Sequence, residues 1–292
     1  IWKGLVGSEM CIRDRSNRLP ILFLPGDTYA NRMPDPVLQQ VEHFNNPNIT
    51  QNDAFKYVTR YFDRITRPEQ ILQTFPQAIQ TMIDPADCGP ACISLSQDVQ
   101  GETFDYPEEF FSEKIHAIRR PRPDDYQIKQ AADLIKKSKN PIIISGGGIF
   151  YSDAMKELSE FAKKHNIPTA QTVMGYSTMK KDDPYFLGAI GGFGGKATNN
   201  FMKKMDLAIA VGTKLADFTT GSWTNFENPN FKLVSINVSR FDASKHMAES
   251  VVGDAKVSLL DISNALGNWK APDDWYKTVS YTHLRAHETL PY

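Results

Sequence analysis

The stretch N-P-I-I-I-S-G-G-G-I-F, from Asn140 to Phe150, decides the fold that this sequence favours. Its apolar run does not alternate with polar residues, which is typical of a strand buried on both faces of a parallel sheet. The three glycines allow a sharp turn and a close approach of the backbone. Ser152 is a candidate helix N-cap, and Met155, Leu158 and Phe161 follow at helical spacing. Strand, glycine turn and helix together predict a doubly wound α/β domain.

Two interpretations of this glycine turn stay open. In the first, a nucleotide or diphosphate binds on the turn. In the second, the turn only connects a strand tightly to a helix and binds nothing. The glycines at 146–148 are not spaced as G-x-G-x-x-G, so the pattern does not decide between the two.

The region around this stretch repeats the same pattern. Buried runs that predict strands lie at Thr169–Val173, Met205–Val211 and Lys232–Val238, and a last helix is expected over about Val257–Leu266. Strands that alternate with helices over this length predict a parallel sheet of about six strands. We assign residues 124–270 to this domain.

The N-terminal half carries a less complete α/β pattern. Strands are predicted at Arg18–Leu24 and Ala91–Leu95, and a helix in between is expected to begin at a capping box of Thr66 and Glu69. Residues 16–100 therefore look like the end of an α/β domain whose first strands are missing. Residues 101–123, which include R-R-P-R-P, predict an inter-domain linker because prolines are frequent there and apolar periodicity is weak.

The two ends of the sequence do not resemble natural protein. Leu5–Asp14 can be back-translated so that the complementary DNA strand encodes V-S-Y-T-H-L-R-A-H-E, which is Val279–Glu288. That DNA resembles a transposase sequencing adapter. We interpret residues 1–15 and 279–292 as adapter-derived tails, and we expect them to be disordered, or helical only by local propensity, and to bury little apolar area. The natural gene would then continue beyond both ends.

Composition excludes several functional classes. The chain has 33 basic and 34 acidic residues and a formal net charge of −1, without a basic cluster, so nucleic acid is not indicated as a partner. No apolar run approaches the ~18 residues that a membrane span needs. Outside the first tail only Cys88 and Cys92 remain, which predicts neither a disulfide framework nor a metal site. A reducing, cytoplasmic location is the expectation.

Six segments taken together resemble the thiamine-diphosphate enzymes of the acetolactate synthase group. In chain order they are L-P-G-D-T (24–28), R-Y-F-D-R-I-T-R-P-E-Q (60–70), S-L-S-Q-D-V-Q-G-E-T-F-D-Y-P (94–107), F-L-G-A-I-G-G-F-G-G (186–195), D-L-A-I-A-V-G-T-K-L-A-D-F-T-T-G-S-W (206–223) and S-I-N-V (235–238). The sequences of segments 97–107 and 217–223 are most similar to the hydrolase branch of that group. This branch opens a cyclic trihydroxy dione to 5-deoxyglucuronate in inositol catabolism.

The resemblance implies a fold and cofactors. It implies the C-terminal part of a pyrimidine-binding α/β domain, followed by a complete central six-stranded, Rossmann-like domain. In the complete enzyme it implies thiamine diphosphate and Mg²⁺, a small cyclic dione as substrate, and a homodimer or homotetramer. The activating glutamate of the family would lie upstream of Ser16 and its Mg²⁺-binding segment downstream of Thr278. The chain itself is then expected to hold no catalytic or metal-binding residue and to bind no cofactor alone.

Several residues have both a functional and a structural interpretation. Asn52, Asp53 and Phe55 correspond to a loop that borders the active site in relatives, so they are candidates to face the substrate; otherwise they form a capped helix start. The glycines of G-x-x-G-x-x-G would touch a flavin in FAD-carrying relatives, or serve close packing. Asp98 would contact a neighbouring subunit or cap a turn, and 217–223 would bind a ligand or form a local loop. These alternatives concern Gly188, Gly191, Gly194, Asp98 and the segment Asp217–Trp223. None of the scattered histidines is read as a ligand.

Three functions compete. The first is a part of the dione hydrolase, and the second is a part of another thiamine-diphosphate enzyme of the acetolactate synthase or carboligase type. The third, from a different class, is a nucleotide-binding module without catalysis. The segment D-F-T-T-G-S-W at 217–223 favours the hydrolase.

Overall fold

The computed structural model describes residues 6–38, 40–41 and 43–277. The chain divides into two compact units, unit 1 (Ile1–Arg119) and unit 2 (Arg120–Tyr292), and each is described by itself. The division falls within residues 101–123. The predicted adapter tail at 279–292 lies outside the described residues. No helix in the described ranges is both long and apolar enough to cross a membrane.

Unit 2 is built on a six-stranded sheet in which every pair of neighbouring strands is parallel. The strands are β5 (Pro141–Ser145), β6 (Thr169–Gln171), β7 (Phe186–Ala189), β8 (Leu207–Val211), β9 (Lys232–Asn237) and β10 (Glu249–Val252). Their order is β10-β9-β8-β5-β6-β7. The chain therefore builds outward from β5 in one direction and from β8 in the other, so the strand order reverses between these two central strands.

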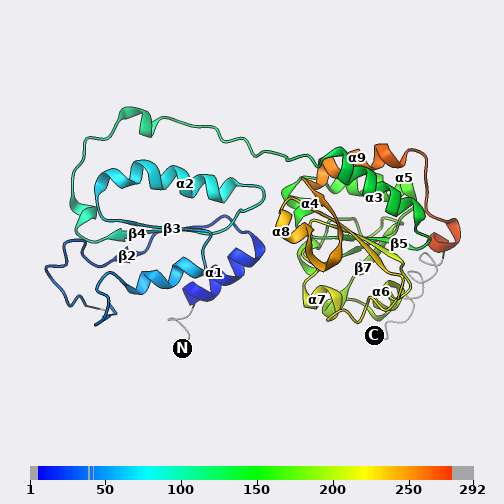
Figure 1. The fold of residues 1–292 in the computed structure, drawn as a ribbon, viewed down its shortest axis with the longest axis horizontal. Coiled ribbons are helices and arrows are strands. Elements are labelled where there is room, and N and C mark those ends of the chain that lie inside the picture. Colours follow the sequence, from blue (N-terminus) through cyan, green and yellow to red (C-terminus); the bar gives the residue numbers. More distant parts are fainter. Residues whose placement is uncertain (1–5, 39, 42, 278–292) are drawn as a thin grey trace. The chain divides into compact units, whose positions relative to one another are not determined.

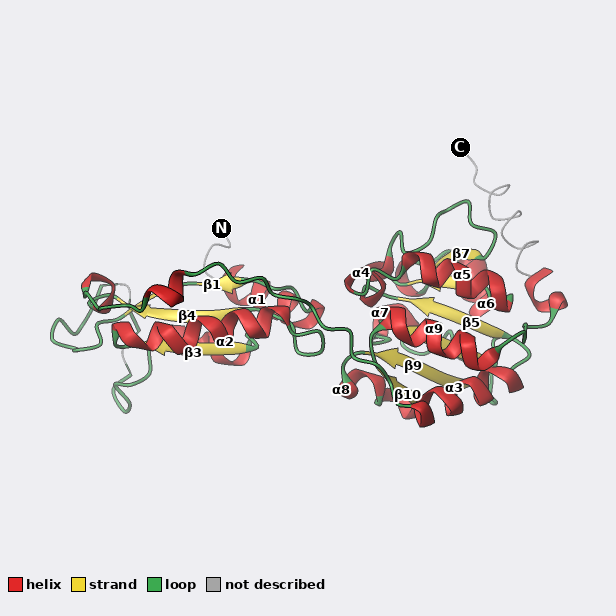
Figure 2. Ribbon diagram, turned by 90° about the horizontal axis from the view of Figure 1, so that it is seen from above, coloured by secondary structure: helices red, strands yellow, loops and turns green. Residues whose placement is uncertain are grey.

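Helices cover both faces of this sheet (Figure 1). On one face lie α3 (Asp125–Lys137), α5 (Met155–His165) and α9 (Ala255–Leu266), and on the other lie α6 (Lys196–Met202) and α7 (Asp217–Thr220). Short helices α4 (Gly148–Tyr151) and α8 (Arg240–Ala243) follow β5 and β9 (Figure 2). Single 3-10 turns are η5 (Val173–Gly175), η6 (Gly191–Phe193) and η7 (Lys245–Met247).

The strands of unit 2 supply two apolar cores. On β5, Ile143 packs into the core beneath α3, α5 and α9, whereas Ile142 and Ile144 pack on the opposite face. All three isoleucines are fully buried. This explains the unbroken apolar run from which the fold was predicted: a strand covered on both faces has no solvent side on which a polar residue could stand.

Unit 1 holds a smaller parallel sheet with β4 (Ala91–Ser96) at its centre. β3 (Tyr61–Ile65) pairs with one side of β4, and the two short strands β1 (Leu22–Phe23) and β2 (Gly26–Asp27) pair in succession with the other. The remaining elements are α1 (Val6–Asn17), η1 (Gln51–Tyr57), η2 (Pro68–Gln70), α2 (Ile71–Ile83), η3 (Val99–Gly101) and η4 (Glu108–Phe111). α2 covers one face of the sheet, and α1 and η1 lie on the other (Figure 1).

The α/β fold class with a six-stranded parallel sheet is confirmed. Two capping predictions are wrong. Ser152 ends α4 instead of starting α5, and its hydroxyl accepts a hydrogen bond from the amide N–H of Ala255 (3.2 Å). At the start of α2 the side chain of Gln70 caps the preceding backbone: its Oε1 accepts from the amide N–H groups of Thr66 and Arg67 at 2.6 and 3.0 Å. The predicted capping box of Thr66 with Glu69 therefore does not form.

Other predictions differ in extent. The strand predicted at Arg18–Leu24 shrinks to Leu22–Phe23, and β2, β3, β7 and β10 were not predicted. The first tail is helical, which was one of the two alternatives for it, but Cys11 and Asp14 are buried, with 6 % and 2 % of their surface exposed. That burial goes beyond the little that was expected of this segment.

Candidate functional site

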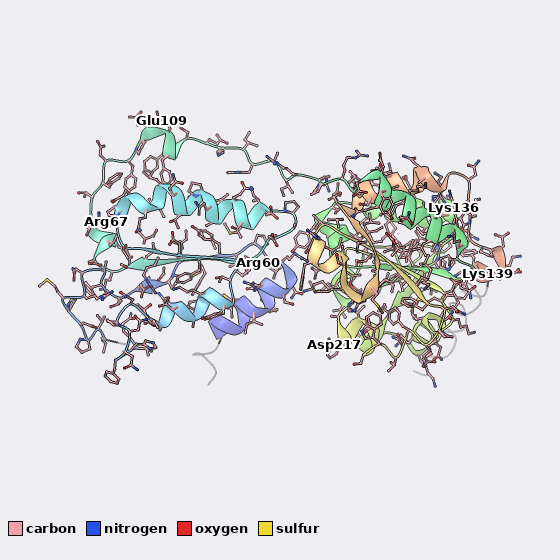
Figure 3. The ribbon with its side chains drawn as sticks, viewed as in Figure 1. Arg60, Arg67, Glu109, Lys136, Lys139 and Asp217 are labelled. Carbon is pink, nitrogen blue, oxygen red and sulfur yellow. The ribbon has the colours of Figure 1, made fainter. Side chains whose placement is uncertain are left out.

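The carboxyl edge of the sheet in unit 1 carries a cluster of buried polar side chains. Asp27 ends β2, Arg64 lies near the end of β3, and Ser94 lies near the end of β4. Arg60 and Arg67 stand at opposite ends of β3 in Figure 3, and the Arg67 end is the carboxyl edge. Because parallel strands end at the same edge, side chains far apart in the sequence meet there.

Arg64 is the centre of this cluster. Its Nε donates to Oδ2 of Asp27 at 2.7 Å, and its Nη2 donates to Oγ1 of Thr50 and Oδ2 of Asp53, both at 2.9 Å. Its Nη1 reaches the carbonyl oxygen of Asn48 at 3.4 Å. One guanidinium therefore ties the end of β2 and the segment 48–53 to β3, in the fork geometry that suits carboxylates.

Asp27 is the most deeply buried charge of the cluster, with 2 % of its surface exposed. Its Oδ1 accepts from the amide N–H of Thr28 at 2.8 Å, and its Oδ2 accepts from Arg64 and from the hydroxyl of Ser94. Burial by itself raises the pKa of Asp27, but hydrogen bonds from Ser94, Arg64 and Thr50 and from the Thr28 amide outweigh it and lower the pKa below the ordinary 3.8. Asp27 is thus held as a carboxylate.

The three predicted substrate-facing residues all lie in η1, at this edge. η1 begins with a capping box in which Thr50 and Asp53 hold each other's backbone N–H groups. Asn52 is 3 % exposed, and its Nδ2 donates to the carbonyl oxygen of Gly26 and to Oγ of Ser94, both at 2.8 Å. Phe55 packs edge-on against Phe23, with ring centroids 4.7 Å apart. Contact of these residues with a substrate stays a prediction, and Asn52 points into the protein.

Asp53 is held from three sides. Its Oδ2 accepts from the amide N–H of Thr50 at 2.6 Å and from Arg64, and its Oδ1 lies 2.5 Å from Nζ of Lys56. Burial raises the pKa of Asp53, but the hydrogen bonds from Lys56, the Thr50 amide and Arg64 outweigh it and lower the pKa. The candidate Asp53 is therefore part of the Arg64 cluster, which sequence reasoning did not identify.

The carboxyl edge of unit 2 is built differently, from backbone. Gly146 and Gly148 donate their amide N–H groups to the carbonyl oxygens of Val211 and Gly212, both at 2.9 Å. A Cβ atom on Gly148 would lie 2.5 Å from Cα of Gly212, which is too close for any side chain. This contact lies between β5 and β8, where the strand order reverses, and such a point is the usual position of the ligand crevice in these sheets. The contacts at 146–148 are those of a tight turn.

The two glycine and aromatic segments singled out in unit 2 lie against each other. A Cβ on Gly191 would lie 1.9 Å from the carbonyl oxygen of Phe218, and the rings of Phe193 and Phe218 stack with centroids 5.6 Å apart. Asn199 holds Gly191 on both sides, accepting from its N–H at 2.9 Å and donating to its carbonyl oxygen at 3.0 Å. Asp217, labelled in Figure 3, starts α7 at the surface. These contacts are those of close packing between two loops.

The other singled-out residues have structural partners. Asp98 accepts from the amide N–H groups of Ala30 and Asn31 at 2.8 and 3.1 Å, so it holds a turn of its own chain. Cys92 is fully buried, and burial raises its pKa to about 12. His165 is fully buried between the carbonyl oxygen of Trp269 (2.8 Å) and Oγ of Ser263 (2.9 Å). Burial lowers the pKa of His165 below the ordinary 6.5.

Within the described residues no three His, Cys, Asp or Glu side chains gather closely enough to hold a metal ion. The carboxylates of the Arg64 cluster are already used by Arg64 and Lys56. These groups therefore do not fit an Mg²⁺–diphosphate site.

Known proteins resemble this chain along most of its length. It is 47 % identical over 260 residues to the "3D-(3,5/4)-trihydroxycyclohexane-1,2-dione hydrolase" of Clostridium botulinum (strain Alaska E43 / Type E3), which covers 87 % of this chain and 40 % of the relative. The protein of the same name from Clostridium tetani is 47 % identical over 276 residues, covering 91 % of this chain and 43 % of the relative. That from Geobacillus thermodenitrificans is 45 % identical over 254 residues, covering 87 % and 39 %. The chain thus spans about 40 % of the length of the curated relatives it matches.

A family comparison places the central part of the chain. Residues 128–262 match the family described as "Thiamine pyrophosphate enzyme, central domain". These residues run from α3 to α9 and include all six strands of unit 2. The family name and the parallel sheet agree with the resemblance drawn from the sequence segments. Residues 128–262 therefore belong to the thiamine pyrophosphate enzyme central domain family.

Proposed function

We propose that this chain is part of a thiamine-diphosphate-dependent hydrolase that opens 3D-(3,5/4)-trihydroxycyclohexane-1,2-dione to 5-deoxyglucuronate in inositol catabolism. The observation that carries the proposal is the 47 % identity over 260 residues to a protein of that name. A match of that length exceeds the size of unit 2, so it must include residues of unit 1 as well. In this proposal unit 1 is the C-terminal part of the pyrimidine-binding domain.

The reaction adds water across the bond between two neighbouring carbonyl carbons. One carbon takes the hydroxyl and becomes the carboxylate, and the other takes the hydrogen and becomes the aldehyde. In the complete enzyme thiamine diphosphate supplies the carbanion stabilisation that such a cleavage requires. We further propose Mg²⁺ as its metal partner, a homodimer or homotetramer as the assembly, and the cytoplasm as the location.

The proposal is tested with the complete coding sequence from which this chain comes. The purified protein, loaded with thiamine diphosphate and Mg²⁺, is given the dione, and the appearance of carboxylate and aldehyde signals is followed by NMR. Pyruvate and simple aldehydes are offered in parallel. Opening of the dione is expected. Formation of acetolactate or of a coupled hydroxyketone, with the dione left intact, would favour a synthase or carboligase and overturn the proposal.

A second measurement concerns the 292-residue chain by itself. Because it spans about 40 % of the length of its relatives, it is expected to bind thiamine diphosphate far more weakly than the complete protein does. Titration calorimetry with thiamine diphosphate and Mg²⁺ measures this. A micromolar dissociation constant for the chain alone would place the cofactor site within it.

A further inference from the structure

The turn η1 exposes different residues from those that the sequence singled out. Asn52 faces the interior, whereas the side chain of Lys56 keeps 50 % of its surface exposed. η1 is tied through Asn52 and Asp53 to the ends of β2, β3 and β4. Ligands of open parallel sheets bind outside the carboxyl ends of the strands. A ligand at this edge would therefore meet Lys56 before it meets Asn52.

Lys56 stands at the outer end of a row of alternating charges. Asp27 is buried and bonded to Arg64; Arg64 donates to Oδ2 of Asp53 at 2.9 Å; and Oδ1 of Asp53 lies 2.5 Å from Nζ of Lys56. The same Nζ lies 5.3 Å from the ring centroid of Phe62, within the range of a cation–π contact. The position of the ammonium is thus set by groups that are themselves fixed in the fold.

The ammonium has capacity left for a ligand. A lysine ammonium carries three donors and no acceptor. Asp53 and Phe62 lie on its protein side, while half of the side chain faces solvent. A fixed, half-exposed cation at a ligand-binding edge suits an anionic oxygen, because hydrogen bonds between two charged groups are roughly twice as strong as neutral ones.

We propose that Lys56 binds an anionic oxygen of the ligand, of the sugar-carboxylate class, and that Arg64 positions Lys56 through Asp53. The inference rests on the proposed function, in which hydrolysis of the dione leaves a carboxylate on one of the two separated carbons. Lys56 is the binding group, and Arg64 and Asp53 act only by holding it.

Binding is measured first on the 292-residue chain, without cofactor. Its lysines are labelled with ¹³C at Cε, and the resonance of Lys56 is identified by its loss in Lys56→Arg. D-glucuronate is the anionic probe and D-glucose its neutral control. We expect glucuronate to shift the Lys56 resonance in a saturable way and glucose to leave it in place. Lys203, which is 38 % exposed and lies 2.6 Å from Glu227, is the matched control and should not respond. No shift, or an equal shift with glucose, overturns the proposal.

Kinetics of the complete enzyme give the second readout. Lys56→Met is expected to raise the inhibition constant for glucuronate about tenfold or more, and by a larger factor than it changes kcat or KM for the dione, because the dione carries no anionic oxygen. Lys56→Arg restores most of the affinity, and Lys203→Met changes none of these constants. Arg64→Lys keeps a positive charge but loses the fork, so it is expected to weaken binding while circular dichroism shows an intact fold. Unchanged affinity in Lys56→Met overturns the proposal.

The two proposals fail in different ways. If the complete wild-type enzyme does not open the dione, the proposed function fails, and the glucuronate titration still decides whether Lys56 binds anions. If the wild type opens the dione but glucuronate inhibits Lys56→Met as strongly as it inhibits the wild type, only the assignment of Lys56 fails.

Discussion

The carboxyl edges of the two sheets are packed in different ways. In unit 1 charged side chains converge there, and a single guanidinium, Arg64, joins Asp27 and Asp53. In unit 2 the backbone itself closes the edge, with Gly148 against Gly212 and Gly191 against the loop of Phe218. One edge depends on the balance of charges and the other on the absence of side chains.

This difference predicts which kinds of change destabilise each unit. A buried charge that loses its partner keeps its desolvation penalty, so the edge of unit 1 is sensitive to changes of charge and of pH. Backbone packed against backbone cannot make room for a methyl group, so the edge of unit 2 is sensitive to volume and indifferent to charge. The four predictions below test this contrast.

The largest effect is expected for Arg64→Met. This change leaves Asp27, 2 % exposed, as a buried carboxylate without its cation. Removing one partner of a buried ion pair typically costs about 3–5 kcal/mol, and we expect the free energy of unfolding of unit 1 to fall by about that amount. Hydrogen exchange of β3 and β4 against urea measures it.

The matched control is Arg67→Met on the same segment of chain. Arg67 is 76 % exposed and lies 4.0 Å from Glu69, so its loss should change stability by less than about 0.5 kcal/mol. Equal effects of the two substitutions would show that the Arg64 cluster contributes no more than a surface ion pair.

The next effect is expected for Gly148→Ala in unit 2. The new Cβ would lie 2.5 Å from Cα of Gly212, and overpacking of this kind typically costs about 1–3 kcal/mol. Trp223, Trp269 and Trp275 lie in unit 2, so tryptophan fluorescence in urea reports its unfolding. Gly195→Ala is the control, because its nearest neighbour is Oγ1 of Thr198 at 4.0 Å. A loss of stability in the control as large as in Gly148→Ala would contradict the packing argument.

The two units should also respond to acid in different windows. The pKa of His165 is lowered in the folded state, so the unfolded state binds the proton more readily, and unit 2 loses stability as the pH falls through 6.5. The pKa of Asp27 is lowered as well, but for a carboxylate the stabilisation is present above 3.8 and is lost only as the pH falls below it. We therefore expect unit 2 to weaken first, between about pH 6.5 and 5.

Thermal unfolding of both units across pH 3–7 measures this order. In His165→Gln the decline of unit 2 near pH 6 should disappear, whatever the substitution does to stability at pH 7. A decline that persists in this variant would assign it to other groups.

The smallest effect is expected for Phe193→Ala. The rings of Phe193 and Phe218 stack, but 70 % and 61 % of their surfaces are exposed. Little burial is lost, and an exposed aromatic pair contributes about 0.5–1 kcal/mol at most. Urea unfolding of unit 2 should thus place this variant close to the wild type. A cost above about 2 kcal/mol would mean that the aromatic pair holds the edge together as much as the glycines do.

The fold of unit 2 was predictable where burial alone determines the sequence. Strands covered on both faces, such as β5 and β8, appear as apolar runs that no polar residue interrupts. The edge strands β7 and β10, of sequence F-L-G-A and E-S-V-V, are short and only partly buried, and they gave no such run. The two helix caps were predicted wrongly because each residue bonds to another partner. The hydroxyl of Ser152 accepts from the distant Ala255, and the amide N–H of Thr66 donates to Gln70 in place of Glu69.

The Arg64 cluster was not predicted, although part of its signal is present in the sequence. Asp63 and Arg64 interrupt an otherwise apolar strand, Y-F-D-R-I, and a charge within such a strand suggests a buried partner. The partners themselves, Asp27 and Asp53, lie 37 and 11 residues away and meet Arg64 only when parallel strands align. For this reason the turn at 51–57 was located by resemblance, whereas the direction of its side chains required the structure.

The contact between Gly148 and Gly212 also constrains how this chain can change over time. The two positions share one space, so neither can accept a larger residue unless β5 and β8 first move apart at their ends. Amino-acid replacement at either position therefore depends on the geometry of the whole sheet. A protein engineer who wished to graft a longer turn with side chains onto β5 would have to redesign the turn after β8 first, since Gly212 of that turn packs directly against Gly148.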